Sequence, residues 1–251
     1  MSTILITGGN TGLGFETAKR LLAVGHKLYI TSRSVEGGRL AAEKLGCEFL
    51  VMDITDEISV QQAFLQYQTR EDSLDVLINN AGIPGERRPI EAVDAALLES
   101  VFATNVFGSL RVIQAFLPLL QRSHNPVIVN VSSGVGSFAK QTDGTTLESK
   151  VISPAYASSK AALSMLTLQY AKALPNMRIN AADPGPTNTG GNFNRGRQSV
   201  TEGTDAIFRL ATLDQNWSYW HLPRSQWLNR LVGPQSKITS LQNRLLDNCS
   251  I

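Results

Sequence analysis

The chain has 251 residues, enough for one α/β domain with a substantial core, since domains of this size bury about three quarters of their unfolded surface. Its formal net charge of +2 gives no case for nucleic-acid or membrane binding. Two cysteines and three scattered histidines exclude a disulfide framework and predict no structural metal. No apolar run approaches the ~18 to 20 residues that span a bilayer, and the chain starts in a strand-like segment without a basic leader, so we expect a cytoplasmic protein.

Short apolar, β-branched strands alternate with amphipathic helices along most of the chain. The strands are expected at 3–9, 27–33, 47–55, 74–82, 127–133 and 177–185, and the helices at 12–24, 35–45, 58–68, 92–121 and 154–174. Strands that are apolar throughout and alternate with helices are typical of a parallel sheet covered on both faces. The sequence therefore predicts a single α/β domain with the doubly wound (Rossmann) fold and six clear strands.

Two polar segments interrupt this pattern, one at 137–153 and one at 186–199. We expect both at the surface and mobile. The second follows the carboxyl end of a strand, where doubly wound folds bind ligands, so it is expected to form a lid over the substrate. Its Arg195 and Arg197 either meet an acidic substrate or are ordinary solvated arginines.

A glycine-rich turn joins the first strand to the first helix, with the sequence TGGNTGLG at residues 7–14. Glycines let the backbone approach a pyrophosphate, and the following helix N-terminus supplies unpaired N–H groups and the positive end of a dipole. A glycine cluster alone is a weak signal. Its position between the first strand and the first helix favours a dinucleotide site.

The end of the second strand indicates which dinucleotide binds there. An acidic residue at this point hydrogen-bonds the ribose of NAD, whereas an arginine accommodates the extra phosphate of NADP. The residues here are Ser32 and Arg33, with no carboxylate beside them. The sequence therefore predicts NADP, the alternative being that Arg33 is an ordinary surface arginine.

Tyr156 and Lys160 lie four residues apart in the last predicted helix. Four residues return to the same helix face, so the phenol and the ammonium should lie side by side. An adjacent cation favours the ionised phenol and lowers its pKa from ~10 toward working pH, which suits general acid-base catalysis. The alternative is a chance pair on a solvated helix face.

Together these motifs make the chain resemble the short-chain dehydrogenase/reductase family, of carbonyl-reductase type, over residues 1–213. The family's adenine-contacting acid matches Asp53, its Asn-Asn-Ala-Gly motif matches 79–82, and its proton-relay asparagine matches Asn105. Its catalytic serine matches Ser133, and its catalytic pair matches Tyr156 and Lys160. The residues assigned to the cofactor NADP (NADPH) are Gly8, Asn10, Thr11, Gly12, Leu13, Gly14, Ser32, Arg33, Asp53, Ile54, Asn80, Ala81, Gly82, Tyr156, Lys160, Pro184, Gly185, Thr187 and Thr189.

The resemblance implies a hydride transfer between NADPH and a carbonyl or secondary alcohol. Ser133 would hydrogen-bond the substrate carbonyl, and Tyr156 would act as general acid or base. Lys160 would lower the Tyr156 pKa and bind the nicotinamide ribose, while Asn105 would hold a water that resupplies the proton. Two alternatives remain open for single residues: Ser132 could take the role of Ser133, and Asn105 could be a helix kink or internal cap.

Other functions and assemblies also remain open. The same fold could serve a non-catalytic redox sensor that binds NADP, or an enzyme crippled by its tail. The 137–153 insertion resembles the extra segment of carbonyl-reductase-type relatives, which can cover the helices that otherwise form a tetramer. We therefore expect either a homodimer or a monomer. Pro186 stands where the family commonly has an aromatic or aliphatic residue, which bears on the lid's entry angle.

Residues 214–251 form an atypical C-terminal tail that holds all three tryptophans (Trp217, Trp220 and Trp227). Nothing in it resembles the seventh strand that the family resemblance implies. Removing one base after the codon for Asp214, in permitted codons, turns DQNWSYWHLPRSQWLNRLVG into DKTGPTGTFLDRNGSIGW followed by a stop, which has the expected glycine turn, strand and short ending. We therefore expect a frameshift, either a real allele or a sequencing error. A real tail would leave the sheet without an edge strand.

Overall fold

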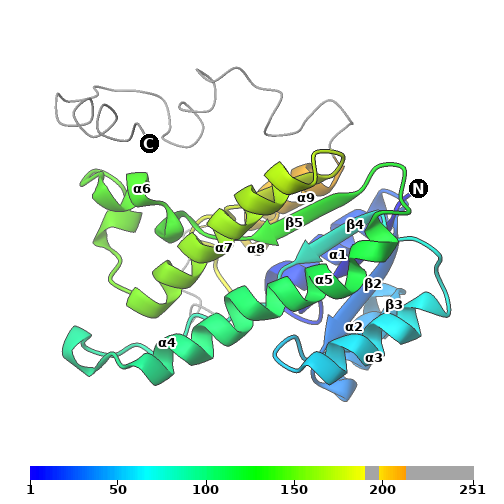
Figure 1. Ribbon diagram of the computed structural model, residues 1–251, viewed down its shortest axis with the longest axis horizontal. Coiled ribbons are helices and arrows are strands. Elements are labelled where there is room, and N and C mark those ends of the chain that lie inside the picture. Colours follow the sequence, from blue (N-terminus) through cyan, green and yellow to red (C-terminus); the bar gives the residue numbers. More distant parts are fainter. Residues whose placement is uncertain (190–197, 213–251) are drawn as a thin grey trace. The chain divides into compact units, whose positions relative to one another are not determined.

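The computed structural model of the protein describes residues 1–189 and 198–212. The predictions for Arg195, Arg197 and the 214–251 tail, including the fate of a seventh strand, lie outside the described residues. Within the described part, six strands form one parallel sheet in the order β3-β2-β1-β4-β5-β6. The predicted doubly wound α/β fold is therefore confirmed (Figure 1).

The strands lie inside the predicted segments and are shorter than predicted. They are β1 (Thr3–Ile6), β2 (Lys27–Ser32), β3 (Glu48–Val51), β4 (Val76–Asn79), β5 (Val127–Val131) and β6 (Arg178–Ala182). The helices are α1 (Gly12–Ala23), α2 (Val35–Leu45), α3 (Glu57–Gln68), α4 (Ala95–Phe102), α5 (Ser109–Leu120), α6 (Phe138–Thr142), α7 (Pro154–Ala173), α8 (Val200–Gly203) and α9 (Asp205–Thr212). Short turns of other helix types are η1 (Ile90–Ala92), η2 (Ala103–Gly108), η3 (Gly134–Gly136) and η4 (Glu148–Lys150).

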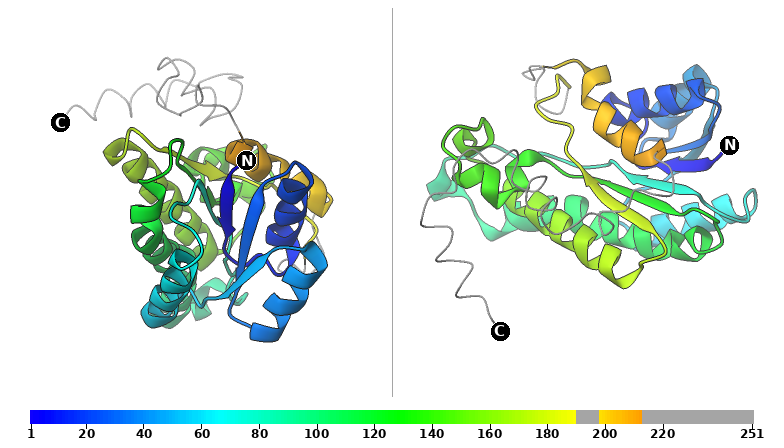
Figure 2. Two further views of the ribbon diagram at one scale, coloured as in Figure 1. Left: turned by 90° about the vertical axis from the view of Figure 1, so that its right-hand side faces the viewer. Right: turned by 90° about the horizontal axis from the view of Figure 1, so that it is seen from above.

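Two hydrophobic cores lie on opposite faces of the sheet, because alternate side chains of each strand point to opposite sides. In β1, Ile4 and Ile6 belong to the core under α1, α2 and α9, whereas Leu5 belongs to the core under α3, α5 and α7. Figure 2 shows these two layers of helices on either side of the sheet. All three side chains are fully buried, and burial of each contributes about 1.5–3 kcal/mol.

The chain reverses its direction of growth between β1 and β4, which are neighbours in the sheet. From β1 it moves outward through β2 and β3, and it then returns to build β4, β5 and β6 on the other side. Doubly wound folds bind ligands at this reversal, at the carboxyl ends of the strands. The turn after β1 and the residues after β4 both lie at this edge, so the fold brings together motifs about seventy residues apart in sequence.

The predicted helix at 92–121 is a continuous helical run from Ala95 to Leu120 with a π-helical turn, η2, in its middle. Asn105 lies in this turn. The run is long and apolar enough to cross a membrane by length and composition alone. Glu99 and Arg111 divide it, so it contains no uninterrupted apolar stretch of ~18 residues. Val112 and Phe116 are fully buried in the core against the sheet, which accounts for its apolar character.

The 137–153 segment contains α6 and η4 where the sequence predicted a loop. The Ser137 hydroxyl caps α6 by accepting the Lys140 N–H. The Asp143 carboxylate accepts the Thr145 N–H at 3.0 Å, and the Thr146 hydroxyl donates to the Lys140 carbonyl oxygen at 2.6 Å. Polar side chains thus close the turns of this segment locally, which is why its hydrophobic pattern gave no signal.

Helices α8 and α9 are attached to α1 through Arg20. Its guanidinium lies 2.8 Å from the Asp205 carboxylate and donates to the Thr204 hydroxyl at 2.6 Å. A capping box between Ser199 and Glu202 begins α8. These contacts fix the point at which the predicted lid returns to the domain.

Candidate active site

The glycine turn after β1 is clamped to the segment after β4. The Thr7 hydroxyl accepts the N–H groups of Asn80 and Ala81, both at 3.0 Å. The Asn80 amide donates in return to the carbonyl oxygens of Thr7 and Gly8, at 2.9 and 3.1 Å. Asn80 and Ala81, predicted to bind the cofactor, therefore also hold the glycine turn in shape.

The turn has room for a phosphate group. Gly8 and Gly12 have positive φ angles of 62° and 55°, which favour glycine. A methyl group at Gly14 would lie 2.5 Å from the Asn80 amide nitrogen, so only glycine fits there, whereas one at Gly12 would meet nothing within 4 Å. The Thr11 side chain caps no N–H of α1, and the first turn of α1 has no acid. These features fit a pyrophosphate at the α1 N-terminus.

Arg33 and Asp53 follow the ends of neighbouring strands, β2 and β3, and face each other closely enough to interact. Two hydrogen bonds from Thr55 lower the pKa of Asp53, and the Arg33 charge lowers it further. Arg33 is exposed, whereas Ser32 is buried and its hydroxyl accepts the Ser34 N–H at 3.1 Å. An open guanidinium therefore stands at the predicted ribose-phosphate position. Ile54, which follows Asp53 in the sequence, is buried.

The two serines after β5 have different partners. The Ser132 hydroxyl is buried, lies 2.7 Å from the Ser164 hydroxyl and donates to the Lys160 carbonyl oxygen at 3.2 Å. The Ser133 hydroxyl acts on the Tyr156 phenol, whose pKa it lowers through a hydrogen-bonding interaction. Because Ser132 is tied to the backbone and side chains of α7, Ser133 is the serine that faces the reacting group.

Tyr156 and Lys160 lie in the first two turns of α7, as predicted. The Lys160 ammonium is 5.6 Å from the centre of the Tyr156 ring and donates to the Val131 carbonyl oxygen at 2.7 Å. Lys160 is only 4% exposed. The pair is therefore a partly desolvated site and not a solvated face of the helix.

The Tyr156 pKa shifts in the direction opposite to the predicted one. Burial raises it above its ordinary value, the hydrogen bond with Ser133 opposes that rise, and the Asp183 carboxylate adds to it. Burial also lowers the pKa of Lys160 to about 8. Desolvation, which the sequence does not reveal, sets the direction of the Tyr156 shift.

Asn105 is fully buried and its amide binds other parts of the site. Its oxygen accepts the Ile83 N–H at 2.8 Å, and its nitrogen donates to the Ile83 carbonyl oxygen and the Ser159 hydroxyl, both at 2.9 Å. A methyl group at Gly82 would lie 3.2 Å from the Asn105 oxygen and 3.5 Å from the Lys160 ammonium. Asn105 therefore joins the segment after β4 to α7, and the π-helical turn is what presents it there.

The segment after β6 is only partly described. Gly185 has a φ of 68°, which allows the turn after Pro184. Thr187 is buried, its hydroxyl donates to the Pro184 carbonyl oxygen at 3.1 Å, and it accepts the Gln198 amide at 3.0 Å. Thr187 therefore stabilises the turn itself. Thr189 is partly buried.

Three charged residues of the site were missed by the sequence predictions: Lys140, Glu148 and Asp183. Lys140 lies between the two acids, at 3.0 Å from Glu148 and 2.8 Å from Asp183. Asp183 directly precedes Pro184 and Gly185, so its position at the end of β6 could have indicated it. Nothing in the local pattern indicates the partners in the 137–153 segment.

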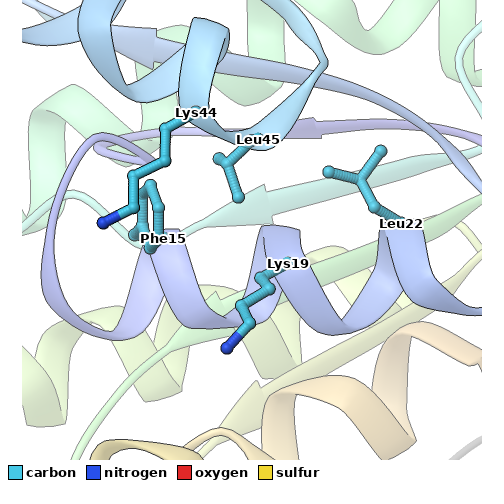
Figure 3. A pocket seen from close by; sticks show the side chains of 5 residues that line it. All are labelled: Phe15, Lys19, Leu22, Lys44 and Leu45. Carbon is cyan, nitrogen blue, oxygen red and sulfur yellow. The ribbon is translucent and has the colours of Figure 1, made fainter.

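A shallow surface depression lies between α1 and α2, away from the residues described above (Figure 3). Phe15, Lys19, Leu22, Lys44 and Leu45 line it, and the Lys44 ammonium is 5.5 Å from the centre of the Phe15 ring. It contains none of the predicted site residues.

Known proteins share this sequence and fold. The family model for short chain dehydrogenases matches residues 2–199. A short-chain dehydrogenase, anuI, of Penicillium roqueforti is 38% identical over 83% of this chain and 88% of its own length. The (+)-neomenthol dehydrogenase of Arabidopsis thaliana is 32% identical over 83% of this chain and 90% of its own.

The solved structures include the NADPH-bound carbonyl reductase from chicken fatty liver. It is 26% identical, with a TM-score of 0.75 over 87% of this chain and 94% of its own. The family match covers both the glycine turn and the Ser133, Tyr156 and Lys160 constellation. The chain belongs to the short-chain dehydrogenase family and is a carbonyl-reductase-like oxidoreductase.

Proposed function

We propose that the protein is an NADP-dependent oxidoreductase that transfers hydride between NADPH and a carbonyl or secondary alcohol, with Tyr156 as general acid and base. The observation that carries this proposal is the buried Lys160 ammonium 5.6 Å from the centre of the Tyr156 ring, with Ser133 acting on the same phenol. A hydroxyl, a phenol and a cation that converge in this way can polarise a carbonyl and protonate its oxygen.

NADPH supplies the hydride when it is bound, and the protein's residues do the rest. Tyr156, protonated because burial raises its pKa, donates its proton to the substrate oxygen. Ser133 donates a hydrogen bond to that oxygen and keeps it beside the phenol. Lys160 stays charged below its pKa, which burial lowers to about 8, and it stabilises the phenolate that remains. Asn105 holds the neighbouring backbone of Ile83 in place.

NADP is preferred over NAD because of the charges at the ends of β2 and β3. Arg33 is exposed and close enough to Asp53 to lower its pKa, and a guanidinium binds a phosphate through charge-assisted hydrogen bonds. The chicken carbonyl reductase, which has the same fold, is described with NADPH bound. Arg33 would hold the phosphate, and the glycine turn the pyrophosphate.

The proposal is tested by following the oxidation of NADPH and of NADH with a panel of ketones, aldehydes and quinones. We expect turnover with at least one carbonyl class and a preference for NADPH. A protein that binds NADPH and reduces none of these substrates would instead be a non-catalytic sensor. Equal use of NADPH and NADH would overturn the cofactor assignment and leave the carbonyl chemistry intact.

A further inference from the structure

Three charged side chains from separate segments meet beside the end of β5. The Lys140 ammonium, on α6, lies 3.0 Å from the Glu148 carboxylate on η4 and 2.8 Å from the Asp183 carboxylate after β6. Lys140 and Asp183 are far apart in sequence, so this contact attaches the 137–153 segment to the sheet. We refer to these three residues as the charged trio.

The charged trio packs directly on the backbone that follows Ser133. A methyl group at Gly134 would lie 2.5 Å from the Glu148 carboxylate, 2.8 Å from Asp183 and 2.8 Å from the Lys140 ammonium. No side chain can therefore separate the trio from the end of β5. The trio is partly exposed to solvent, and it lies against the backbone directly after Ser133.

Asp183 is a fixed anion at this position. Burial opposes its charge, but hydrogen bonds from Lys140 and from the Gly185 N–H, at 2.8 and 3.0 Å, outweigh burial and hold the pKa of Asp183 below its usual value. Its charge acts on Tyr156 and raises the pKa of the phenol. A permanent negative charge therefore works against ionisation of Tyr156.

Among the described groups around Tyr156, none besides Lys140 offsets the negative charge of Asp183. Lys160, on the same helix, is directed to the Val131 carbonyl oxygen, and Ser133 is neutral. Of the elements that pack against α7, η2 and η3 carry no charge, and α4 carries Glu99, which is exposed. Arg178 lies at the start of β6, at the end of the strand opposite to Asp183. Lys140 is the described cation in contact with Asp183.

We propose that Lys140 is a positioning residue: it docks the 137–153 segment onto the end of β6 and offsets the Asp183 charge beside Tyr156. The proposal rests on the proposed role of Tyr156 as general acid. It gives the insertion a function, because the insertion supplies the cation. Removal of Lys140 leaves the Glu148 and Asp183 carboxylates without their cation next to the end of β5. Removal of the Asp183 charge leaves Lys140 paired with Glu148.

The test is a titration of Tyr156 by NMR in the full chain labelled with ¹³C-tyrosine, with the signal identified by its loss in Tyr156→Phe. The variants are Lys140→Met, Asp183→Asn, both together, and Lys140→Arg as the conservative variant. Lys150→Met is the matched control, because Lys150 lies on η4 and is exposed. We expect Lys140→Met to raise the Tyr156 pKa and Asp183→Asn to lower it, each by about 0.5–1 unit. The double variant should lie between them.

Opposite shifts in the two single variants separate a charge effect from a loss of structure, which would move both in one direction. Lys140→Arg and Lys150→Met should leave the titration close to that of the wild type. Unchanged titration in Lys140→Met, or shifts of the same sign in both single variants, would overturn the proposal. Because the titration needs neither cofactor nor substrate, it remains decisive even if the carbonyl panel shows no turnover.

Discussion

The Lys160 ammonium lies 5.6 Å from the centre of the Tyr156 ring while it donates to the Val131 carbonyl oxygen at 2.7 Å. Burial favours the neutral form of both side chains: it raises the pKa of Tyr156 and lowers the pKa of Lys160. The phenol is therefore protonated near neutral pH, as a proton donor must be. The arrangement of the two side chains costs folding stability, and that cost can be measured.

Lys160→Met should remove a pH-dependent loss of folding stability. The pKa of Lys160 falls from 10.5 to about 8 on folding, so the unfolded chain binds the proton more tightly and wild-type stability rises with pH between these values. The shift corresponds to on the order of 3 kcal/mol below pH of about 8. We expect the unfolding free energy of the variant, relative to wild type, to fall by roughly this amount from pH 8 to 10.5.

Urea unfolding of both proteins across this pH range measures the difference. The other lysines titrate in both proteins, so their contributions to the difference in unfolding free energy cancel. The lost hydrogen bond to Val131 lowers the variant's stability by about 1–3 kcal/mol at every pH, so the slope and not the offset carries the test. A difference that does not change with pH would show that Lys160 is not desolvated.

Ser133→Ala and Ser132→Ala should separate catalysis from packing. Ser133→Ala should lower kcat by about 10²–10³-fold with little change in stability, because it removes the hydrogen bond to the reacting oxygen. Ser132→Ala should keep kcat within a few-fold and cost about 1 kcal/mol of stability, because it loses its bonds to α7. Steady-state kinetics and thermal unfolding of both variants check this. The reverse pattern would assign the catalytic role to Ser132.

Arg33→Ala should weaken the binding of NADPH but not of NADH. Loss of a charge-assisted contact costs about 1.5–3 kcal/mol, or roughly 10- to 100-fold in the Kd for NADPH. Arg39→Ala is a matched control, because Arg39 lies on α2 and pairs with Glu43 at 3.0 Å. Fluorescence titrations with both cofactors supply the values. An equal loss of affinity for NADPH and NADH in Arg33→Ala would contradict a contact between Arg33 and the extra phosphate of NADPH.

The order of strands and helices could be predicted because it follows from hydrophobic periodicity. Helix α2 has the predicted bounds, Val35–Leu45, and each strand lies within its predicted segment. The π-helical turn at Asn105 could not be predicted, since apolar periodicity indicates a helix over this segment without showing which of its turns is widened. The candidate catalytic residues followed from motifs, but the direction of the Tyr156 pKa shift and the contacts of Lys140 and Asn105 did not.

Those properties depend on contacts between distant segments. The rise of the Tyr156 pKa is set by burial and by Asp183, and no local pattern reveals either. The Lys140 contact with Asp183 joins a polar insertion to a strand end. Asn105 was assigned to the family's relay position, and its amide binds Ile83 and Ser159, which the motif does not indicate. Motifs identify residues, and tertiary packing decides their electrostatics.

The tail can be tested by replacement of everything after Asp214 with KTGPTGTFLDRNGSIGW. Among the described residues, β6 pairs with β5 only, so a strand in the restored ending would cover its other edge. We expect a higher Tm and a greater soluble yield, measured by thermal unfolding and by sedimentation of lysates. A restored chain that is less stable would oppose the frameshift, and an intact frame for Trp217 and Trp220 in independent clones would exclude a sequencing error.

The most direct test of the account is Tyr156→Phe, which removes one hydroxyl from the site. The variant should bind NADPH within a few-fold of the wild-type Kd and lose about 10²–10⁴-fold in kcat for carbonyl reduction, because the hydroxyl proposed to donate the proton is gone. A variant with undiminished turnover would contradict the central claim that Tyr156 is the acid.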